Sequence, residues 1–402
     1  MTSVGHARSA NRSAVLAVVL SARALDRNRI VEATGLSRAT VFRIIDELKA
    51  QGIAVEVPLE ALTGPGRPPT GIALNRAARR VCGVDLGGSN CRFAVADLAG
   101  RVLGRARQRT PRELEGAELA DWIRARLAEL LGSDMTDLAA LAVGVPGALS
   151  GDAAEIVGSQ NLPQIVGTGF IDALQNGVPA PVIIENDSNL ALTGELAYGA
   201  LDRNDTVSML SIGTGLGTAA AIDGRLMRTK DGRLGEFGRL NLPGSKLKLR
   251  DLVSGAGLVA HAHETGLDLE DAQELFADPD RFPSLFRQVN DALVHLVAIV
   301  ALAYEPSSIL VTGGVSDGVD DDLLTRIGAE ASDIVGVPVA VRRASLGDNA
   351  GLYGALSAAL TSSYRDLGVA TDQLAGIEVD RAAVRDSFGD AAATSIDPES
   401  RT

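Results

Sequence analysis

Val84-Asp85-Leu86-Gly87-Gly88-Ser89-Asn90 ends a strand-like run at two glycines and a hydroxyl. Ile212-Gly213-Thr214-Gly215-Leu216-Gly217-Thr218 repeats this arrangement after another strand-like run. Glycines lack a Cβ, so phosphate oxygens can approach their backbone N–H groups, and an adjacent aspartate can organise a metal or a water. Two such turns predict two lobes that grip one polyphosphate, although each turn alone is compatible with a tight hairpin. The candidate phosphate-binding residues are Asp85, Gly87, Gly88, Ser89, Gly213, Thr214, Gly215 and Gly217.

Short strand-like runs alternate with helical patterns from residue 81 onward. This alternation is typical of α/β layering. A third glycine pair, Gly313-Gly314, follows a further strand-like run at a place where a nucleotide could lie. The sequence therefore predicts an α/β fold for the larger part of the chain.

A polar cluster lies between the two glycine turns and follows a buried strand, at Glu185-Asn186-Asp187-Ser188-Asn189. An aspartate at the end of a strand can act as general base on a ligand hydroxyl, so Asp187 is the candidate catalytic residue. Asn186 offers both a donor and an acceptor to a polyol. A helix cap is the alternative, but it explains one or two of these residues rather than four.

The first 80 residues show a different pattern. Their apolar residues recur at three- and four-residue spacing, which is typical of helices around a small shared core. Two short apolar runs flank a glycine- and proline-rich segment and are typical of a two-stranded wing. We predict a winged helix-turn-helix domain over residues 1–78, with helices at residues 11–22, 27–34 and 38–51 and strands at residues 53–57 and 70–73.

The turn before the third of these helices carries the physical marks of a helix-turn-helix. Gly35 permits a left-handed backbone, and Ser37 is a strong N-cap that decides where the recognition helix begins. The cap would direct Arg38, Thr40 and Arg43 at base edges and phosphates of the major groove, with Ser37 on a phosphate. An ordinary helical hairpin with surface arginines is the alternative.

Charge is divided unevenly along the chain. Residues 1–80 hold 12 Arg and Lys against 6 Asp and Glu, whereas the remainder holds 26 against 45. A basic module on an acidic body is what phosphate binding by one end predicts, and a chance imbalance is the alternative.

The segment between the two predicted wing strands contains Gly64-Pro65-Gly66-Arg67-Pro68. It holds Arg67 extended, as an arginine in a narrow A·T-rich minor groove requires. A turn in the wing or a linker would explain the same residues.

Composition narrows the class of protein. A chain of 402 residues with 46% hydrophobic residues can bury a sizeable core. It contains no apolar run approaching the roughly 18 to 20 residues of a membrane span and no export signal, so we expect a cytoplasmic protein. Cys82 and Cys91 lie in or beside apolar runs and are predicted to be buried reduced thiols. The polar tail, residues 362–402, is expected to be partly disordered.

Together, the motifs resemble the ROK family (repressor, open reading frame, kinase) with the DNA-binding N-terminus of its regulator branch. The resemblance runs from about residue 11 to residue 356. It rests on Thr-Gly-Leu-Ser-Arg-Ala-Thr-Val at 34–41, Gly-Arg-Pro at 66–68, Asp-Leu-Gly-Gly-Ser at 85–89, Gly-Val-Pro-Gly at 144–147, Asn-Leu-Pro at 161–163, Glu-Asn-Asp-Ser-Asn at 185–189, Gly-Thr-Gly-Leu-Gly at 213–217, Gly-Glu-Phe-Gly at 235–238 and Leu-Gly-Asp-Asn-Ala-Gly at 346–351.

The resemblance implies two α/β lobes of the actin-like sugar-kinase type over residues 79–361, usually assembled as dimers or tetramers. The first lobe would comprise about residues 79–200 with a C-terminal helix at about 348–361, and the second about residues 201–347. In kinases of the family the residue matching Asp187 is the catalytic base. The residues that match the family's sugar contacts are Asn161, Asn186 and Glu236.

The chain departs from the family pattern where kinases and several regulators carry a His, a cysteine-rich zinc loop and a sugar-binding Glu. Arg239 replaces the His, residues 240–255 contain no cysteine, and Arg250 stands at the position of the Glu. A closed structural zinc site needs four soft or imidazole ligands, so no structural zinc is expected. As ligand-binding residues the two arginines suggest a phosphate or carboxylate on the ligand, and pairing with a carboxylate such as Asp251 is the alternative.

Two functions are compatible with this sequence. The first is a transcriptional regulator, a repressor of carbohydrate-related genes, which binds double-stranded operator DNA as a homodimer or tetramer. Its kinase-like domain, with Asp187 vestigial, would sense a sugar or sugar-phosphate effector by coupling two sites. The second is an ATP-dependent sugar kinase that also regulates, because both glycine turns and Asp187 are retained. ATP binding fits either function, and we predict no metal or other cofactor.

Overall fold

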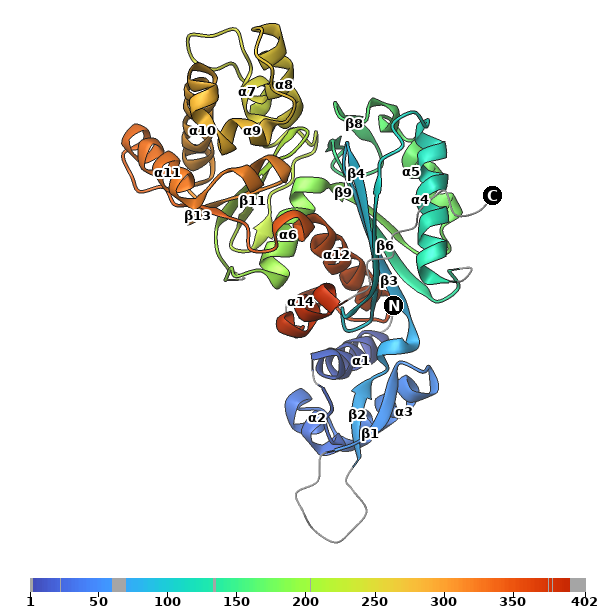
Figure 1. Cartoon of the computed structure of the whole chain (residues 1–402). Coiled ribbons are helices and arrows are strands. Elements are labelled where there is room, and N and C mark those ends of the chain that lie inside the picture. Colours follow the sequence, from blue (N-terminus) through green and yellow to red (C-terminus); the bar gives the residue numbers. More distant parts are fainter. Residues whose placement is uncertain are drawn as a thin grey trace.

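A computed structural model of the chain describes residues 3–21, 23–59, 70–132, 135–202, 204–374, 376–377 and 379–390. Figure 1 shows a small N-terminal module, in blue, below two larger α/β lobes. The first lobe is cyan to green and the second is yellow to orange. The predicted fold class, a winged helix-turn-helix joined to a two-lobed α/β body, is confirmed.

The N-terminal module packs three helices against a two-stranded antiparallel wing. Val15, Ile30 and Val41 are fully buried between the helices, as their spacing predicts. The second and third helices lie where predicted to within one residue. The first helix begins at Ser3 rather than at residue 11. Residues 6–10 are exposed and show no apolar spacing, so the spacing of apolar residues could not predict this part of the helix. The elements are α1 (Ser3–Ser21), α2 (Arg27–Thr34), α3 (Arg38–Ala50), β1 (Ala54–Pro58) and β2 (Thr70–Leu74).

Capping residues decide where α2 and α3 begin and end. Asp26 accepts hydrogen bonds from the N–H groups of Asn28 and Arg29, and α2 ends at Gly35, which has a left-handed φ of +66°. The hydroxyl of Ser37 accepts a bond of 3.3 Å from the N–H of Thr40 at the start of α3. The predicted turn chemistry is confirmed, and at the start of α3 it leaves Arg38 and Ala39 exposed while Val41 faces the module's core.

The first lobe is a five-stranded sheet in the order β5-β4-β3-β6-β9. Helices α4 and α5 cover one face and α6 and α12 the other (Figure 1), so Cys82 and Val81 of β3 enter different cores. Cys82 and Cys91 are free and buried, as predicted, and burial raises the pKa of Cys82 to about 12. The elements are β3 (Arg80–Leu86), β4 (Asn90–Asp97), β5 (Val102–Arg109), α4 (Gly116–Leu131), β6 (Leu138–Val145), β7 (Ala148–Leu149), β8 (Ile156–Gly158), α5 (Gly169–Gly177), β9 (Val182–Asn186), α6 (Asp187–Tyr198) and α12 (Ala350–Asp366).

The second lobe is a five-stranded sheet in the order β12-β11-β10-β13-β14 with five helices. Within the described residues, α10 is the one helix long and apolar enough to cross a membrane. Half of its most apolar window is buried in the lobe, where Leu296 and Val300 join the core, so packing explains its composition. The elements are β10 (Val207–Ile212), β11 (Leu216–Ile222), β12 (Arg225–Leu226), α7 (Leu249–Val253), α8 (Gly255–Glu264), α9 (Ala272–Ala277), α10 (Pro283–Tyr304), β13 (Ser308–Thr312), α11 (Asp321–Val335) and β14 (Val341–Arg343).

The C-terminal part is more regular than expected from its composition. Helix α12 continues to Asp366, so the predicted boundary at residue 361 falls inside a helix, and α13 (Thr371–Leu374) and α14 (Arg381–Asp390) follow. The Phe388 ring of α14 stacks on Tyr353 with ring centroids 4.3 Å apart. Few large apolar side chains mark these helices in sequence, and their packing on the first lobe orders them. Residues 391–402 lie outside the described residues.

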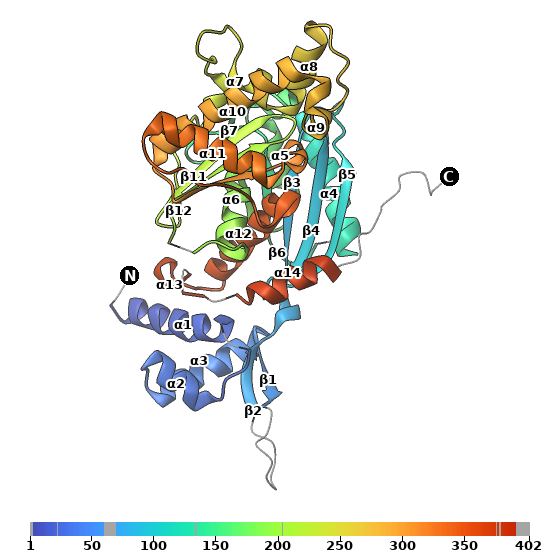
Figure 2. The ribbon, with the colours of Figure 1, turned by 60° about the vertical axis from the view of Figure 1, so that its left-hand side comes forward.

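The N-terminal module is joined to the lobes by more than its linker. Figure 2 shows α1 lying below α13 and α14. The hydroxyl of Ser13, on α1, accepts a 2.7 Å hydrogen bond from the N–H of Ala370 and also bonds the side-chain oxygen of Gln373. Buried apolar residues of α1, including Leu16, belong to one continuous core with α12 and Tyr364. The module and the first lobe therefore share a core.

Candidate functional site

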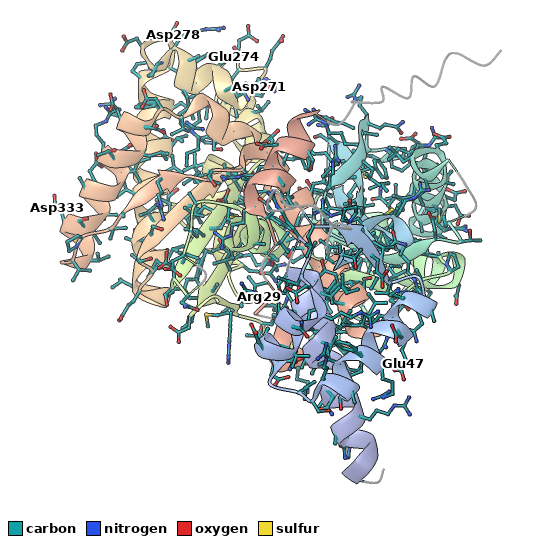
Figure 3. The ribbon with its side chains drawn as sticks, turned by 90° about the horizontal axis from the view of Figure 1, so that it is seen from below. Arg29, Glu47, Asp271, Glu274, Asp278 and Asp333 are labelled. Carbon is teal, nitrogen blue, oxygen red and sulfur yellow. The ribbon has the colours of Figure 1, made fainter. Side chains whose placement is uncertain are left out.

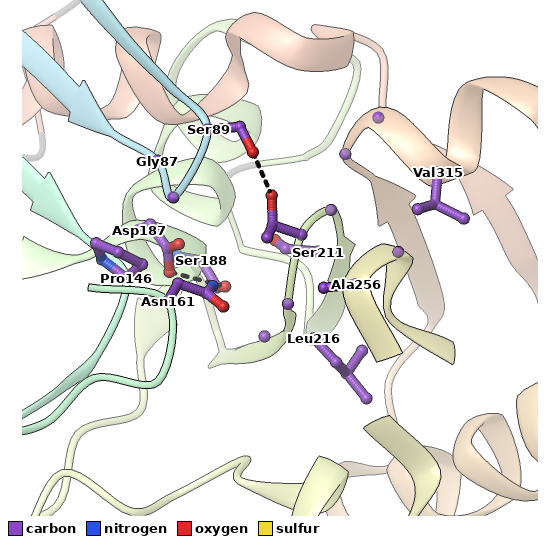
Figure 4. Close-up of a pocket in the computed structure, with 18 of the residues that line it drawn as sticks. Gly87, Ser89, Pro146, Asn161, Asp187, Ser188, Ser211, Leu216, Ala256 and Val315 are labelled. Atoms are coloured by element: carbon purple, nitrogen blue, oxygen red, sulfur yellow. Dashed lines mark hydrogen bonds between the residues drawn. The ribbon is translucent and has the colours of Figure 1, made fainter. Parts of the chain in front are cut away.

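A cleft of about 680 Å³ lies between the lobes (Figure 4). Both glycine turns and the polar cluster after β9 face it. Arg250 is not among the described residues that line it. The structure brings the other predicted cleft residues together here: Asp85, Gly87, Gly88, Ser89, Asn161, Asn186, Asp187, Gly213, Thr214, Gly215, Gly217, Glu236 and Arg239.

The two glycine turns meet across the cleft. The hydroxyls of Ser89 and Thr214 lie 3.0 Å apart, a hydrogen bond that joins the first lobe to the second (Figure 4). A Cβ on Gly88 would lie 3.0 Å from the Cβ of Asn161, and one on Gly215 would lie 2.7 Å from its amide nitrogen. The absence of side chains on these glycines therefore lets Asn161 sit between the turns. Within the turns, the N–H of Gly87 donates to the carbonyl of Asn90 at 2.9 Å, and that of Gly213 donates to the carbonyl of Gly215 at 3.0 Å.

Asp187 begins α6 directly after β9 and lies on the floor of the cleft. Its Oδ1 accepts a 2.7 Å hydrogen bond from the N–H of Ser188 and a 3.3 Å bond from the Ser188 hydroxyl. Burial, the charge of Asp85 and, more weakly, that of Glu236 raise the pKa of Asp187 to about 7, against the bonds from Ser188. A carboxylate with this pKa can accept a proton from a ligand hydroxyl near neutral pH.

Asn186 can serve both as a helix cap and as a ligand contact, the two roles that the sequence leaves open. Its side-chain oxygen caps α6 by accepting bonds from the N–H groups of Ser188 and Asn189, at 3.0 and 3.1 Å. Its amide nitrogen donates to the carbonyl of Gly147 at 3.0 Å. One amide N–H is left for a ligand, so Asn186 can offer a donor to the cleft while its acceptor serves the helix.

Asp85 forms an ion-pair group that the sequence reading missed. Arg92 Nη1 lies 3.2 Å from Asp85 Oδ2, and Arg92 Nη2 lies 2.7 Å from Asp348 Oδ2. Burial raises the pKa of Asp85, and the neighbouring guanidinium opposes this rise. The only signals in sequence were the position of Arg92 in the strand after the first glycine turn and Asp348 in the Leu-Gly-Asp-Asn-Ala-Gly segment.

The two arginines at departures from the family pattern both have carboxylate neighbours. Arg239 Nε donates to Glu236 Oε2 at 3.0 Å, at the rim of the cleft. Arg250 Nε lies 3.5 Å from Asp251 Oδ1. Pairing with Asp251 was the alternative to a ligand contact in the sequence analysis, and the structure shows this pair for Arg250. Arg239 forms a comparable pair with Glu236. The side chain of Arg239 is 55% exposed and that of Arg250 is 32% exposed. Ion pairs this close to water are weak, so either arginine could exchange its carboxylate for a ligand.

The cysteine-free loop, residues 240–255, is closed by backbone bonds and leucines. The N–H of Leu242 donates to the carbonyl of Leu247 at 2.9 Å, and that of Leu249 donates to the carbonyl of Leu240 at 2.8 Å. Leu249 is fully buried in the second core, and Leu242 and Leu247 pack against it. Among the described residues, no group of three or more His, Cys, Asp or Glu could hold a metal ion.

The recognition-helix candidates lie on one surface of the N-terminal module. Ser37, Arg38 and Arg43 are exposed and Thr40 is half-buried. The guanidinium of Arg38 lies 5.1 Å from the centre of the Phe42 ring, and Arg43 pairs with Glu47 one turn along α3. Both contacts are at the surface, where such pairs contribute about 1 kcal/mol or less. Arg67 lies outside the described residues.

Comparisons with known proteins agree with this architecture. A family model described as the ROK family matches residues 81–362. The chain is 27% identical over 312 residues to the glucokinase of Halalkalibacterium halodurans, covering 68% of this chain and 92% of that one. It is 26% identical over 238 residues to the xylose repressor of Bacillus subtilis, covering 58% of this chain and 61% of the repressor.

A solved structure extends the likeness to the whole fold. The crystal structure of a ROK family transcriptional regulator, a homologue of the E. coli MLC protein, superposes with a TM-score of 0.71. The match covers 92% of this chain and all of the other at 18% identity. The likeness includes the winged helix-turn-helix and the two actin-like lobes. At 18% identity it shows the fold and nothing further.

Proposed function

The chain belongs to the ROK family, and from that premise we propose that it is a cytoplasmic DNA-binding transcriptional regulator. It represses carbohydrate-related genes and binds double-stranded operator DNA as a homodimer or tetramer. Its ligand is a sugar or sugar-derived molecule bound between the lobes. The observation that carries this proposal is a helix-turn-helix with exposed arginines whose core continues into a ligand-sized cleft domain.

The charge distribution supports DNA as the partner of the N-terminal module. Residues 1–80 hold 12 Arg and Lys against 6 Asp and Glu. Seen from below, Asp271, Glu274 and Asp278 gather at the far end of the second lobe, away from Arg29 on the module (Figure 3). An acidic far end is repelled by DNA, and the basic module is attracted to it. The protein would therefore approach DNA with its helix-turn-helix first.

The DNA contacts follow from the geometry of α3. Arg38, Thr40 and Arg43 would reach base edges and phosphates of the major groove, and Ser37 would bind a phosphate. Arg67, between the wing strands, would enter the minor groove. One module reads one half-site, so two copies in a homodimer would read the two halves of an operator.

Helix α12 is the structural element that would carry the ligand signal. Its first turn touches the site, because a Cβ on Gly351 would lie 3.0 Å from the carboxyl carbon of Asp85. Its 17 residues span about 25 Å, and the chain after it holds Ser13 of α1 through Ala370. A ligand that displaces the first turn of α12 would therefore move the support of α1 and so bias two arrangements of the DNA-binding module.

An ATP-dependent sugar kinase is the second candidate, and two observations favour it. Asp187 lies in the cleft with a pKa near 7, which suits a general base, and the glucokinase relative shares the two-lobed part of the chain. If the protein is a regulator, Asn161, Asn186 and Glu236 bind the ligand's hydroxyls and Arg239 contacts an acidic group on it, whereas Arg250, which does not line the cleft, keeps its pair with Asp251. Asp187 then orients the ligand without transferring a proton.

One experiment separates the two functions. The purified protein is titrated by fluorescence anisotropy against the DNA upstream of its own and neighbouring genes, with a panel of sugars and sugar phosphates, and ATP turnover is followed in the same samples. We expect specific DNA binding that one ligand shifts without ATP turnover. Ligand-dependent ATP consumption with no specific DNA binding would make the kinase the function.

A further inference from the structure

Arg92 lies between two carboxylates of the cleft. In the β3–β4 hairpin it is directly opposite Asp85, and its second guanidinium nitrogen reaches Asp348 in the segment that returns from the second lobe to α12. The side chains of Arg92 and Asp85 are only 17% and 13% exposed, and that of Asp348 is 31% exposed. All three line the cleft.

These two carboxylates are the donor set that a divalent cation would use beside the glycine turns. Mg²⁺ in nucleotide sites is held by one or two carboxylates together with phosphate oxygens, in octahedral geometry with metal–oxygen distances of about 2.1 Å. Here one oxygen of each carboxylate already accepts a hydrogen bond from Arg92. A guanidinium between them also supplies positive charge where the metal's charge would act. The residues present therefore do not fit a divalent metal.

We propose that Arg92 takes the place of a divalent cation in this cleft, so that the cleft binds its ligand without a metal ion. The inference rests on the proposed function, because a sensor needs a bound ligand but no metal-assisted phosphoryl transfer. It deepens that function by specifying the ligand class: a sugar or sugar derivative rather than a magnesium–nucleotide complex.

The hairpin geometry keeps Arg92 in this position. Asp85 and Arg92 are cross-strand partners, so pairing of β3 with β4 places the two side chains on the same face. The next strand places Arg107 opposite Arg92. Arg107 also lines the cleft but is exposed, so water screens its charge from the position between the two carboxylates. Arg107 is therefore a matched control for charge without the carboxylate contacts.

The test measures Mn²⁺ binding to the full chain by electron paramagnetic resonance of the free ion, with MnCl₂ as the probe. Wild type is compared with Arg92→Ala, Arg92→Gln, Arg107→Ala and the double variant Arg92→Ala/Asp348→Asn. We expect both Arg92 variants to bind Mn²⁺ roughly tenfold or more tightly than wild type, because two carboxylates lose their paired cation. The double variant should lose this gain, and Arg107→Ala should resemble wild type.

Two results would overturn the proposal. One is an Arg92 variant that remains folded by circular dichroism and gains no Mn²⁺ site. The other is a wild-type Mn²⁺ site that the single change Asp348→Asn removes, and this comparison holds even where an Arg92 variant does not fold. Operator binding by the same wild-type protein, measured in EDTA, tests the regulator proposal separately from the metal-free cleft. Its absence would refute the regulator without changing the Mn²⁺ result.

Discussion

The hydroxyl of Ser89 in the first lobe lies 3.0 Å from the hydroxyl of Thr214 in the second. This contact joins the two glycine turns across the mouth of the cleft, so any ligand that enters between the turns must accommodate or break it. Since the same two turns border the part of the cleft where Asn161 and Asp187 lie, the contact reports on whether the lobes are closed.

Loss of the Ser89 hydroxyl should loosen the lobes more than it destabilises the fold. For Ser89→Ala we expect the free energy of unfolding to fall by about 1 kcal/mol or less, because the lost bond is exposed to water. Hydrogen–deuterium exchange in residues 87–90 and 213–217 should rise. Ser307→Ala, which removes a bond to the carbonyl of Thr206 within the second lobe, is the control and should leave exchange in both turns unchanged.

Stability should depend on pH through Asp187. Its pKa is raised from the usual 3.8 to about 7 in the fold, so the folded state binds the proton more tightly and loses stability as the pH rises from 3.8 to about 7. Asp187→Asn removes this loss. Its advantage over wild type should grow by up to about 1.4 kcal/mol per pH unit between pH 5.5 and 7 and level off above, as urea unfolding would measure.

A carboxylate away from the cleft provides the baseline for this pH series. Asp333, at the end of the second lobe in Figure 3, is exposed on α11. An advantage of Asp187→Asn that matches Asp333→Asn at every pH would mean that the cleft does not raise the pKa of Asp187.

The recognition-helix assignment predicts a specific loss of DNA binding. Arg43→Ala and Arg67→Ala should each weaken operator binding by roughly 1 to 3 kcal/mol in a gel-shift titration. Arg326→Ala, which removes an exposed arginine on α11, should bind like wild type. If both Arg43→Ala and Arg67→Ala also bind like wild type, the DNA-contact assignment is wrong.

The bond between α1 and the C-terminal segment should hold the module to the lobes. Ser13 is 1% exposed, and Ser13→Ala leaves the N–H of Ala370 without its 2.7 Å acceptor. We expect a loss of about 1 to 3 kcal/mol and a separate early melting transition of the N-terminal module in calorimetry. Ser21→Ala, at the exposed end of the same helix, should melt as wild type does. A single unshifted transition in Ser13→Ala would contradict the coupling.

Metal removal should leave the second lobe intact. Residues 240–255 are held by backbone bonds and buried leucines, so we expect no stoichiometric zinc by elemental analysis and no change of Tm after dialysis against EDTA. About one zinc per chain, with a Tm that falls on its removal, would show that this loop binds metal after all.

The local part of the architecture could be predicted from the sequence. Helices α2 and α3 begin at capping residues, Asp26 and Ser37, whose side chains bond the first N–H groups of the helix within three residues along the chain. The glycine turns were equally readable, because Gly87 and its hydrogen-bond partner Asn90 are three residues apart. Patterns of this kind act over one turn, so a short sequence contains them completely.

Two features were beyond the reach of such patterns. The start of α1 at Ser3 lies among exposed residues that have no apolar periodicity. The helices after residue 361 also have little apolar periodicity, and packing on the first lobe orders them. The amide of Ala370 and its acceptor Ser13 are 357 residues apart. Composition alone pointed to a polar tail there, because it says nothing of a surface on which the tail can fold.

By itself the sequence determined the fold class, the turn chemistry and the glycine turns and polar cluster that face the cleft, since each depends on neighbours in the chain. Only the tertiary structure decided what those residues do to one another. Arg92 meets Asp85 because β3 and β4 pair in one register, and it meets Asp348, 256 residues away, because the return from the second lobe ends there. Charges interact through space rather than along the chain, so the neutralised carboxylates and the raised pKa of Asp187 follow from the folded arrangement.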